Sequence, residues 1–269
     1  MSINPIDDRL GKHLSPGDRH YRAFVSHPDN YDIVAALQFN LLTSLGLREH
    51  HYLLDIGCGS LRGGRLFIPY LLSGHYFGIE PEQWLIEEGI KHELGESILA
   101  VKQPSFAHDR SFNLEVFGRT FDFLLAQSIF SHASALQIKA CVASAKKVMK
   151  PDAIFVANFV ESNENYTGHE WVYPGGSYYT LDFMCRLVEE QGMTCIPIHW
   201  PHPVGLRWIL IVHPQQANRQ FLKDMDVVTL RAERDAALAR LCKIESHPYV
   251  MFGRTVRRWL YALLQRRTH

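Results

Sequence analysis

Three features that would place a chain in a special class are missing from this sequence. The 28 Lys and Arg residues balance the 28 Asp and Glu residues, so no excess charge attracts the chain to nucleic acid. No apolar run approaches the roughly 20 residues that span a bilayer. The first residues lack the basic and apolar regions of a signal peptide. We therefore expect a cytoplasmic protein that binds no nucleic acid.

Cysteine is scarce, and its copies are scattered along the chain. No Cys-x-x-Cys pair occurs, which favours reduced thiols over disulfides or a zinc site. No Asp-rich cluster indicates a divalent metal either, so we expect no metal ligands. The five cysteines are Cys58, Cys141, Cys185, Cys195 and Cys242.

A glycine-rich stretch follows the first strongly apolar run. Tyr52–Ile56 has the pattern of a buried parallel strand, and it ends at Gly57 and Gly59. Glycines permit a tight turn and let a ligand lie against bare backbone. The pattern predicts that Leu61 opens a helix, whose N-terminus presents free N–H groups and the positive dipole end. Together these elements predict a nucleotide-type site at the carboxyl end of a parallel sheet.

The third glycine of a dinucleotide fingerprint is also missing, because Arg62 occupies its position. The stretch instead resembles motif I of the class I S-adenosylmethionine-dependent methyltransferases, in which an acidic residue precedes Gly-x-Gly as Asp55 does here. Leu61 replaces the usual third glycine of that motif. The resemblance implies that the motif contacts the cofactor. Its residues here are Asp55, Gly57, Cys58, Gly59, Ser60, Leu61 and Arg62.

Two further acidic residues follow predicted strands. Glu80 ends the strand 75–80, where a carboxylate can accept both ribose hydroxyls of S-adenosylmethionine or of NAD. The alternative is a solvated carboxylate at a strand end. Asp109 ends the strand 105–109, and the resemblance implies that it accepts the adenine amino group.

The fourth predicted strand, 121–128, has the composition of the methyltransferase motif IV. The resemblance implies that Gln127 and Ser128 face the sulfonium. His132 follows, and a neutral imidazole can take a proton near neutral pH, so we predict it to be the general base. His169 and Glu170 are the competing candidates. Alternatively, His132 caps the helix 135–149 or holds Gln127.

A polar, aromatic and glycine-rich loop spans 161–179, after the fifth predicted strand (153–160). Long loops at this edge of a sheet commonly recognise substrates. Aromatic rings would suit a sugar or another flat acceptor, although they could equally pin the loop to itself. The predicted substrate contacts are Tyr166, His169, Glu170, Trp171 and Tyr173.

The alternation of helices and strands predicts a doubly wound, mostly parallel α/β sheet. The strands 195–200 and 206–212 form a terminal antiparallel hairpin, which is typical of class I methyltransferases. We therefore predict a Rossmann-like sheet of seven strands with a C-terminal helical extension. The expected domains are an N-terminal arm (1–29), a methyltransferase domain (30–214) and a helical tail (215–269).

The tail contains a charged helical stretch, 230–241, which resembles short coiled-coil tails of bacterial surface-polysaccharide enzymes. Its last helix carries apolar residues on one face and arginines on the other. Such a helix docks on its own core, on a partner chain, or on the inner face of an anionic membrane.

Taken with the resemblance, these patterns predict S-adenosylmethionine-dependent methyl transfer to a small-molecule or glycan acceptor, with oxygen as the expected acceptor atom. A NAD-dependent enzyme is disfavoured by Arg62 and by the terminal hairpin. A further alternative function is that of a catalytically silent methyltransferase-like module that binds a partner through its tail.

Overall fold

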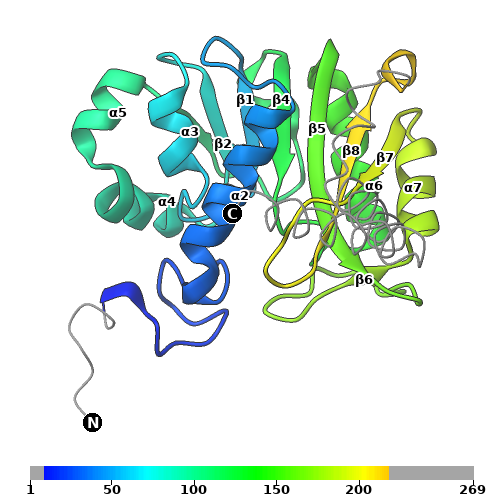
Figure 1. Cartoon of the computed structure of the whole chain (residues 1–269), viewed down its shortest axis with the longest axis horizontal. Coiled ribbons are helices and arrows are strands. Elements are labelled where there is room, and N and C mark those ends of the chain that lie inside the picture. Colours follow the sequence, from blue (N-terminus) through cyan, green and yellow to red (C-terminus); the bar gives the residue numbers. More distant parts are fainter. Residues whose placement is uncertain (1–8, 218–269) are drawn as a thin grey trace, which may run out of the picture. The chain divides into compact units, whose positions relative to one another are not determined.

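Eight strands form a single sheet in the part of the chain that the structure describes, residues 9–217 (Figure 1). In this computed structural model the strand order is β3-β2-β1-β4-β5-β8-β7, with β6 alongside the end of β5. Only β8 runs antiparallel to its neighbours β5 and β7. The strands are β1 Leu53–Ile56, β2 Tyr76–Ile79, β3 Ser105–Ala107, β4 Phe121–Ala126, β5 Met149–Glu161, β6 Tyr178–Tyr179, β7 Thr194–Ile198 and β8 Arg207–Val212.

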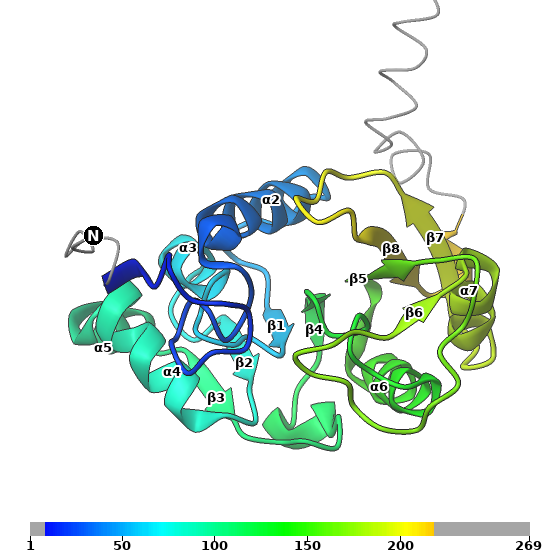
Figure 2. The ribbon, with the colours of Figure 1, turned by 90° about the horizontal axis from the view of Figure 1, so that it is seen from below.

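The α-helices cover both faces of this sheet (Figure 2). They are α2 Tyr31–Ser44, α3 Gly64–Tyr70, α4 Gln83–Gly89, α5 Glu96–Lys102, α6 Ala135–Val148 and α7 Leu181–Glu189. Shorter segments are the 3-10 helices η1 Pro28–Asn30, η3 Leu114–Phe117 and η4 Pro214–Gln216 and the π-helical turn η2 Ile90–Leu94. Within residues 9–217, none of these helices is long and apolar enough to cross a membrane.

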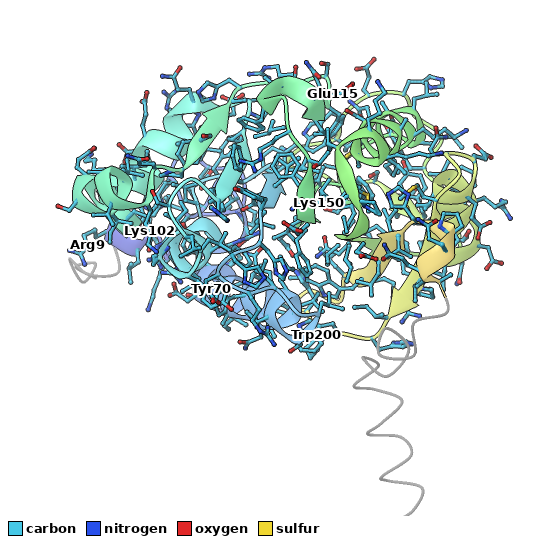
Figure 3. All side chains as sticks on the ribbon, turned by 90° about the horizontal axis from the view of Figure 1, so that it is seen from above. Arg9, Tyr70, Lys102, Glu115, Lys150 and Trp200 are labelled. Atoms are coloured by element: carbon cyan, nitrogen blue, oxygen red, sulfur yellow. The ribbon has the colours of Figure 1, made fainter. Side chains whose placement is uncertain are left out.

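Alternation along the strands divides the core into two clusters. On β4, Leu124 and Ala126 pack with α6 and α7, whereas Phe123 and Leu125 pack with α2 and α3. Successive strand residues point to opposite faces, and both faces of a parallel sheet are normally covered. This explains why β1 is buried at every position. Side chains fill the space between sheet and helices, and Trp200 donates from its indole to Leu37 O of α2 (Figure 3).

The predicted α/β sheet and its terminal hairpin are confirmed. Because β2 and β3 lie on one side of β1 and β4 and β5 on the other, the strand order reverses between β1 and β4. The carboxyl ends of the strands therefore open a crevice at this point, where ligands bind in open α/β sheets.

Local structure departs from the predictions in several places. Strand β6 lies inside the predicted loop 161–179 and gives eight strands instead of the predicted seven. Helix α3 begins at Gly64 rather than at Leu61, which lies in the left-handed region at φ 59°. Leucine thus keeps the backbone conformation that glycine adopts most readily. Helix α5 was not predicted. Strand β5 begins at Met149, directly after α6, and is longer than the predicted 153–160.

The N-terminal segment is packed rather than loose over residues 9–29. Arg22 is buried and pairs with Glu93 at 2.6 Å, and Arg65 pairs with the other oxygen of the same carboxylate at 2.8 Å. The Tyr21 hydroxyl also donates to Glu93. These contacts attach the segment to α3 and η2. Residues 1–8 and 218–269, including most of the predicted tail and its membrane or partner contacts, lie outside the described residues.

Ser134 starts α6 with a capping box. Its hydroxyl accepts from the backbone N–H of Gln137, and the Gln137 side chain accepts from the backbone N–H of Ser134. The N-cap of α6 is therefore Ser134.

We expect Ser134→Ala to lower the free energy of unfolding by about 1 kcal/mol, because a buried N–H of the first turn loses its acceptor. Leu136→Ala is the matched control on the same turn, since Leu136 is 61% exposed. That change is expected to remain within about 0.5 kcal/mol of wild type. Urea unfolding followed by circular dichroism measures both, and equal effects of the two variants would contradict the assignment.

Candidate active site

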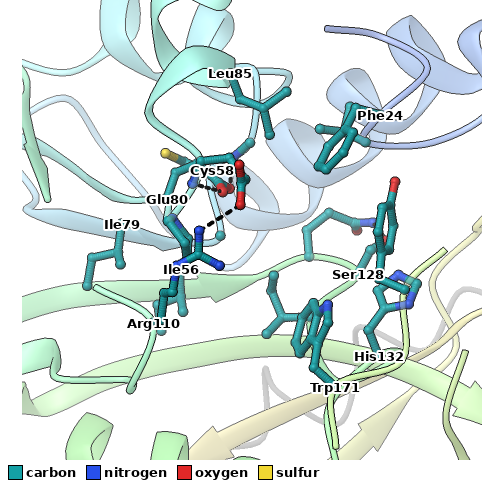
Figure 4. A pocket seen from close by; sticks show the side chains of 18 of the residues that line it. Phe24, Ile56, Cys58, Ile79, Glu80, Leu85, Arg110, Ser128, His132 and Trp171 are labelled. Carbon is teal, nitrogen blue, oxygen red and sulfur yellow. Dashed lines mark hydrogen bonds and ion pairs between the residues drawn. The ribbon is translucent and has the colours of Figure 1, made fainter. Parts of the chain in front are cut away.

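A cavity of about 530 Å³ lies at the carboxyl ends of β1, β2 and β4. Glu80 and Cys58 lie on one side of it, and His132 and Trp171 on the other (Figure 4). Phe24, from the N-terminal segment, contributes to the wall as well. The cavity therefore joins the glycine turn, the strand ends and the loop 161–179.

The glycine turn borders the cavity with bare backbone. Gly57 and Gly59 have positive φ, and a Cβ at either position would clash with Ile129 or Val25 respectively. The N–H groups of Gly57 and Cys58 both donate to Ile79 O, which closes the turn against β2. Glycine is therefore required here by conformation and by space.

Glu80 orients its buried carboxylate toward this turn. One oxygen accepts from the Gly59 N–H at 3.0 Å, and the other accepts from the Glu82 N–H at 2.9 Å. Burial raises the pKa of the Glu80 carboxyl, and the two backbone hydrogen bonds partly oppose that rise. Each carboxylate oxygen keeps a further lone pair, so Glu80 is a rigid acceptor for ligand hydroxyls.

Asp55, Ser60 and Leu61 do not line the cavity. Asp55 lies below the turn, where it accepts from the Tyr76 hydroxyl at 2.7 Å. The Tyr31 hydroxyl donates to Ser60 O at 3.0 Å from α2. The structure thus places these three predicted cofactor residues beside the turn and outside the lining of the cavity.

Arg62 is a buried cation, and among the carboxylates of residues 9–217 only that of buried Asp55 interacts with it, without a direct ion pair. Its side chain lines the cavity, the residue is only 6% exposed, and its one hydrogen bond runs from Nη1 to Val25 O at 3.2 Å. No carboxylate of residues 9–217 lies within ion-pair distance. Burial lowers the pKa of Arg62 to about 10, so the guanidinium stays protonated at neutral pH. A buried, unpaired arginine is unfavourable unless a ligand supplies the negative charge.

Asn158 of β5 positions the end of β4. Its Nδ2 donates to Gln127 Oε1 at 2.7 Å, and its Oδ1 accepts from the Ser128 N–H at 2.7 Å. Both Gln127 and Ser128 line the cavity, and Ser128 has a positive φ. One buried amide therefore fixes the two residues that were predicted to face the sulfonium.

His132 is held by the loop 161–179 in one tautomer. Its Nδ1 lies 2.7 Å from Gly175 O and 3.0 Å from Val172 O. Both partners are carbonyl acceptors, so Nδ1 carries the proton and Nε2 keeps its lone pair. Burial lowers the pKa of His132 below its ordinary value of 6.5, and the two hydrogen bonds partly offset this. The ring is therefore neutral at pH 7. Ser134, not His132, caps α6, and no hydrogen bond joins His132 to Gln127.

Only part of the loop 161–179 reaches the cavity. Trp171 and Tyr173 line it, and the Tyr173 hydroxyl is buried without a hydrogen-bond partner among the described residues. Tyr166 packs against the core and its hydroxyl approaches Glu170 O, while His169 and Glu170 are exposed. These three residues do not line the cavity, so of the predicted substrate contacts only Trp171 and Tyr173 do.

Asp109 lines the opposite end of the cavity from His132. Its carboxylate accepts from the Ser111 and Asn113 N–H groups, each at 2.8 Å, and from the Ser111 hydroxyl. These bonds fix the turn after β3. Arg110 and Phe112 line the same end and were not predicted.

Phe24, Val25 and Asn158 also contribute to the site, and the sequence alone did not predict them. Phe24 packs on Trp84 and Tyr173 with ring centroids 5.2 Å apart in each case. No local pattern marks these residues, because each reaches the site through a contact with a distant segment. On helix α2, none of Tyr31, Gln38 and Asn40 lines the cavity.

Solved structures with the same fold include methyltransferases that bind S-adenosylmethionine. The magnesium protoporphyrin IX methyltransferase ChlM from Synechocystis PCC 6803, with bound S-adenosylmethionine, aligns at a TM-score of 0.55 and 12% identity over 78% of this chain and 92% of that one. The complex of DhpI with S-adenosylhomocysteine aligns at 0.53 and 13% over 80% and 100%. DesVI from Streptomyces venezuelae aligns at 0.51 and 13% over 68% and 92%.

No protein-family model matches the sequence, and no curated protein matches it. The likeness therefore concerns the fold, and the chain has the class I methyltransferase fold.

The buried Asp55 carboxyl should make stability depend on pH. Burial raises its pKa from 3.8 to about 6, so between these values the folded state binds more protons than the unfolded chain. This stabilisation is fully present below the unfolded pKa and is lost as pH rises through the folded pKa. Asp55→Asn removes the titration, so its stability relative to wild type should rise by about 3 kcal/mol between acid and neutral pH.

Urea unfolding at a series of pH values measures this difference. Asp29→Asn is the control, because the Asp29 side chain is 61% exposed. The control should track wild type, and a constant offset for Asp55→Asn across the series would contradict the burial argument.

Proposed function

We propose that this chain binds S-adenosylmethionine and transfers its methyl group to an oxygen of a small-molecule or glycan acceptor. The observation that carries the proposal is the pair of buried groups on either side of the glycine turn. Glu80 offers a fixed carboxylate, and Arg62 offers a buried cation that no carboxylate of residues 9–217 pairs with directly.

S-adenosylmethionine has the groups that this pair requires. Its ribose carries two hydroxyls that can donate to Glu80, and its amino-acid end carries a carboxylate that can pair with Arg62. The adenine would then lie toward Asp109 and Phe112, and the methyl group toward Gln127 and Ser128. The fold supports the choice of cofactor, because solved structures of the same fold include complexes with S-adenosylmethionine and S-adenosylhomocysteine.

Methyl transfer is an in-line displacement. The acceptor oxygen forms a bond to the methyl carbon as the carbon–sulfur bond breaks, and sulfur leaves as a neutral thioether. An acceptor hydroxyl also loses its proton, and His132 Nε2 has the free lone pair to take it. Trp171, Tyr173 and Phe24 would provide flat faces that align the acceptor.

Two alternative functions can be distinguished from methyl transfer by experiment. A NAD-dependent enzyme would place a pyrophosphate against Arg62, but the antiparallel β8 and β7 at the sheet edge support a methyltransferase. A catalytically silent module would bind S-adenosylmethionine without turnover. Isothermal titration calorimetry with S-adenosylmethionine, S-adenosylhomocysteine and NAD separates the first alternative, and an assay with methyl-labelled donor separates the second.

Glu80→Ala and Arg62→Met should each weaken binding of S-adenosylmethionine in the calorimeter. Loss of the Glu80 hydrogen bonds is expected to lower affinity by more than about tenfold. Loss of Arg62 should lower it by about a hundredfold, because the ligand carboxylate would be buried unpaired. Arg62→Lys keeps the charge but not the fork of donors, and is expected to fall between Arg62→Met and wild type.

Glu87→Ala and Arg48→Met serve as matched controls, since neither residue lines the cavity. Both should bind as wild type does. Unchanged affinity in Glu80→Ala or Arg62→Met, with the fold intact by circular dichroism, would remove that residue from the cofactor site. Preferential binding of NAD would overturn the proposed function itself.

His132→Ala should lower turnover by about 10²–10⁴-fold while cofactor affinity stays unchanged. The acceptor for this assay comes from a screen of hydroxylated rings and sugars with methyl-labelled donor. His169→Ala is the control, because His169 is exposed and does not line the cavity. Turnover of His132→Ala within a few-fold of wild type would show that the base lies elsewhere or that none is needed.

A further inference from the structure

Two cysteines that are distant from the cavity lie side by side in the fold. The Sγ atoms of Cys185, on α7, and Cys195, on β7, are 3.0 Å apart, and both residues are free thiols. Ten positions separate them in the sequence, so the spacing gave no sign of a pair. Cys58 and Cys141, by contrast, are buried.

The elements that carry the pair hold it in place. Helix α7 lies beside β7 in both ribbon views (Figures 1 and 2), and it buries Met184, Leu187 and Val188 in the core. Lys146 donates to Gln191 O in the short connection between them. Since a disulfide has an S–S length of about 2.05 Å, the sulfurs need to approach by only about 1 Å.

We infer that Cys185 and Cys195 are a redox-active dithiol that a disulfide oxidant, such as glutathione disulfide, converts to an intramolecular disulfide. The inference rests on this geometry and on the partial exposure of both residues. It does not depend on the proposed methyl transfer.

The reaction proceeds by two thiol–disulfide exchanges. The Cys185 thiolate attacks one sulfur of glutathione disulfide, so a mixed disulfide forms and one glutathione thiolate leaves. The Cys195 thiol gives up its proton and attacks Cys185 Sγ, and the second glutathione leaves. The protein loses two hydrogens, and the two glutathione molecules gain them.

Cys185 is the better first nucleophile. The contact with Cys195 lowers the pKa of the Cys185 thiol and raises that of Cys195. Arg207 also favours the Cys185 thiolate, whereas Glu189 and Asp182 oppose it. The thiolate, rather than the thiol, is the attacking species.

The disulfide would join two elements that lead into the cavity walls. Helix α7 follows directly on the loop that carries Trp171 and Tyr173. Strand β7 precedes the segment in which His202 contacts Gln127 at 3.4 Å. Oxidation would therefore link covalently the helix that follows the loop 161–179 and the strand that precedes His202.

The test incubates the full-length wild-type protein with glutathione disulfide, blocks free thiols with iodoacetamide, and maps the cysteine peptides by mass spectrometry. We expect a Cys185–Cys195 linked peptide that is two hydrogens lighter than the reduced pair and that disappears with dithiothreitol. Cys58 and Cys141 are internal controls, and they should stay outside any disulfide because they are buried.

Two variants test the order of the steps. In Cys195→Ser the mixed disulfide of glutathione with Cys185 should accumulate, because nothing resolves it. In Cys185→Ser neither the linked peptide nor a comparable adduct should form. The wild-type melting temperature should rise by several degrees on oxidation, and that of Cys195→Ser should not.

Free Cys185 and Cys195 in the wild type after oxidation would overturn the inference. Glutathione that persists on wild-type Cys185, or a disulfide from either residue to Cys242, would overturn it as well.

Discussion

A buried arginine that forms no direct ion pair with a carboxylate of residues 9–217 sets the chemistry of this cavity. Arg62 is only 6% exposed, and its guanidinium meets a single backbone carbonyl, Val25 O. The buried Asp55 carboxylate interacts with the guanidinium but does not pair with it directly, so a ligand that brings an anion to Arg62 would stabilise the site. Glu80, on the other side of the glycine turn, favours a ligand that carries hydroxyl groups, because its oriented carboxylate can accept hydrogen bonds from them.

The N-terminal segment is what keeps Arg62 out of water. Val25 O accepts a hydrogen bond from the Arg62 guanidinium, and the Val25 side chain occupies the space that a Cβ of residue 59 would need. Phe24 packs on Tyr173. This segment is anchored by the ion pairs that Arg22 and Arg65 form with Glu93. The wall of the cavity therefore depends on charges that lie outside it, and the same segment contacts both the glycine turn and Tyr173 of the loop 161–179.

The acceptor side depends on backbone carbonyls rather than on charges. Val172 O and Gly175 O fix the proton of His132 on Nδ1, so the loop that would recognise the acceptor also decides which ring nitrogen is basic. From the neighbouring strand, the side-chain amide of Asn158 fixes the positions of Gln127 and Ser128 by two hydrogen bonds. Because the His132 ring and the Asn158 amide are largely buried, losing any of these hydrogen bonds would cost more free energy than it would at the surface.

The sequence by itself determined the alternation of strands and helices, the glycine turn and the acidic residue after β2. These follow from local periodicity and from the conformations that glycine allows, so they could be predicted without tertiary contacts. Only the tertiary structure decided that Asp55 faces Tyr76 instead of the cavity, that Tyr166, His169 and Glu170 miss it, and that Phe24 reaches it. It also brought Cys185 to Cys195. Each of these depends on contacts between segments far apart in the chain, which side-chain pattern does not encode.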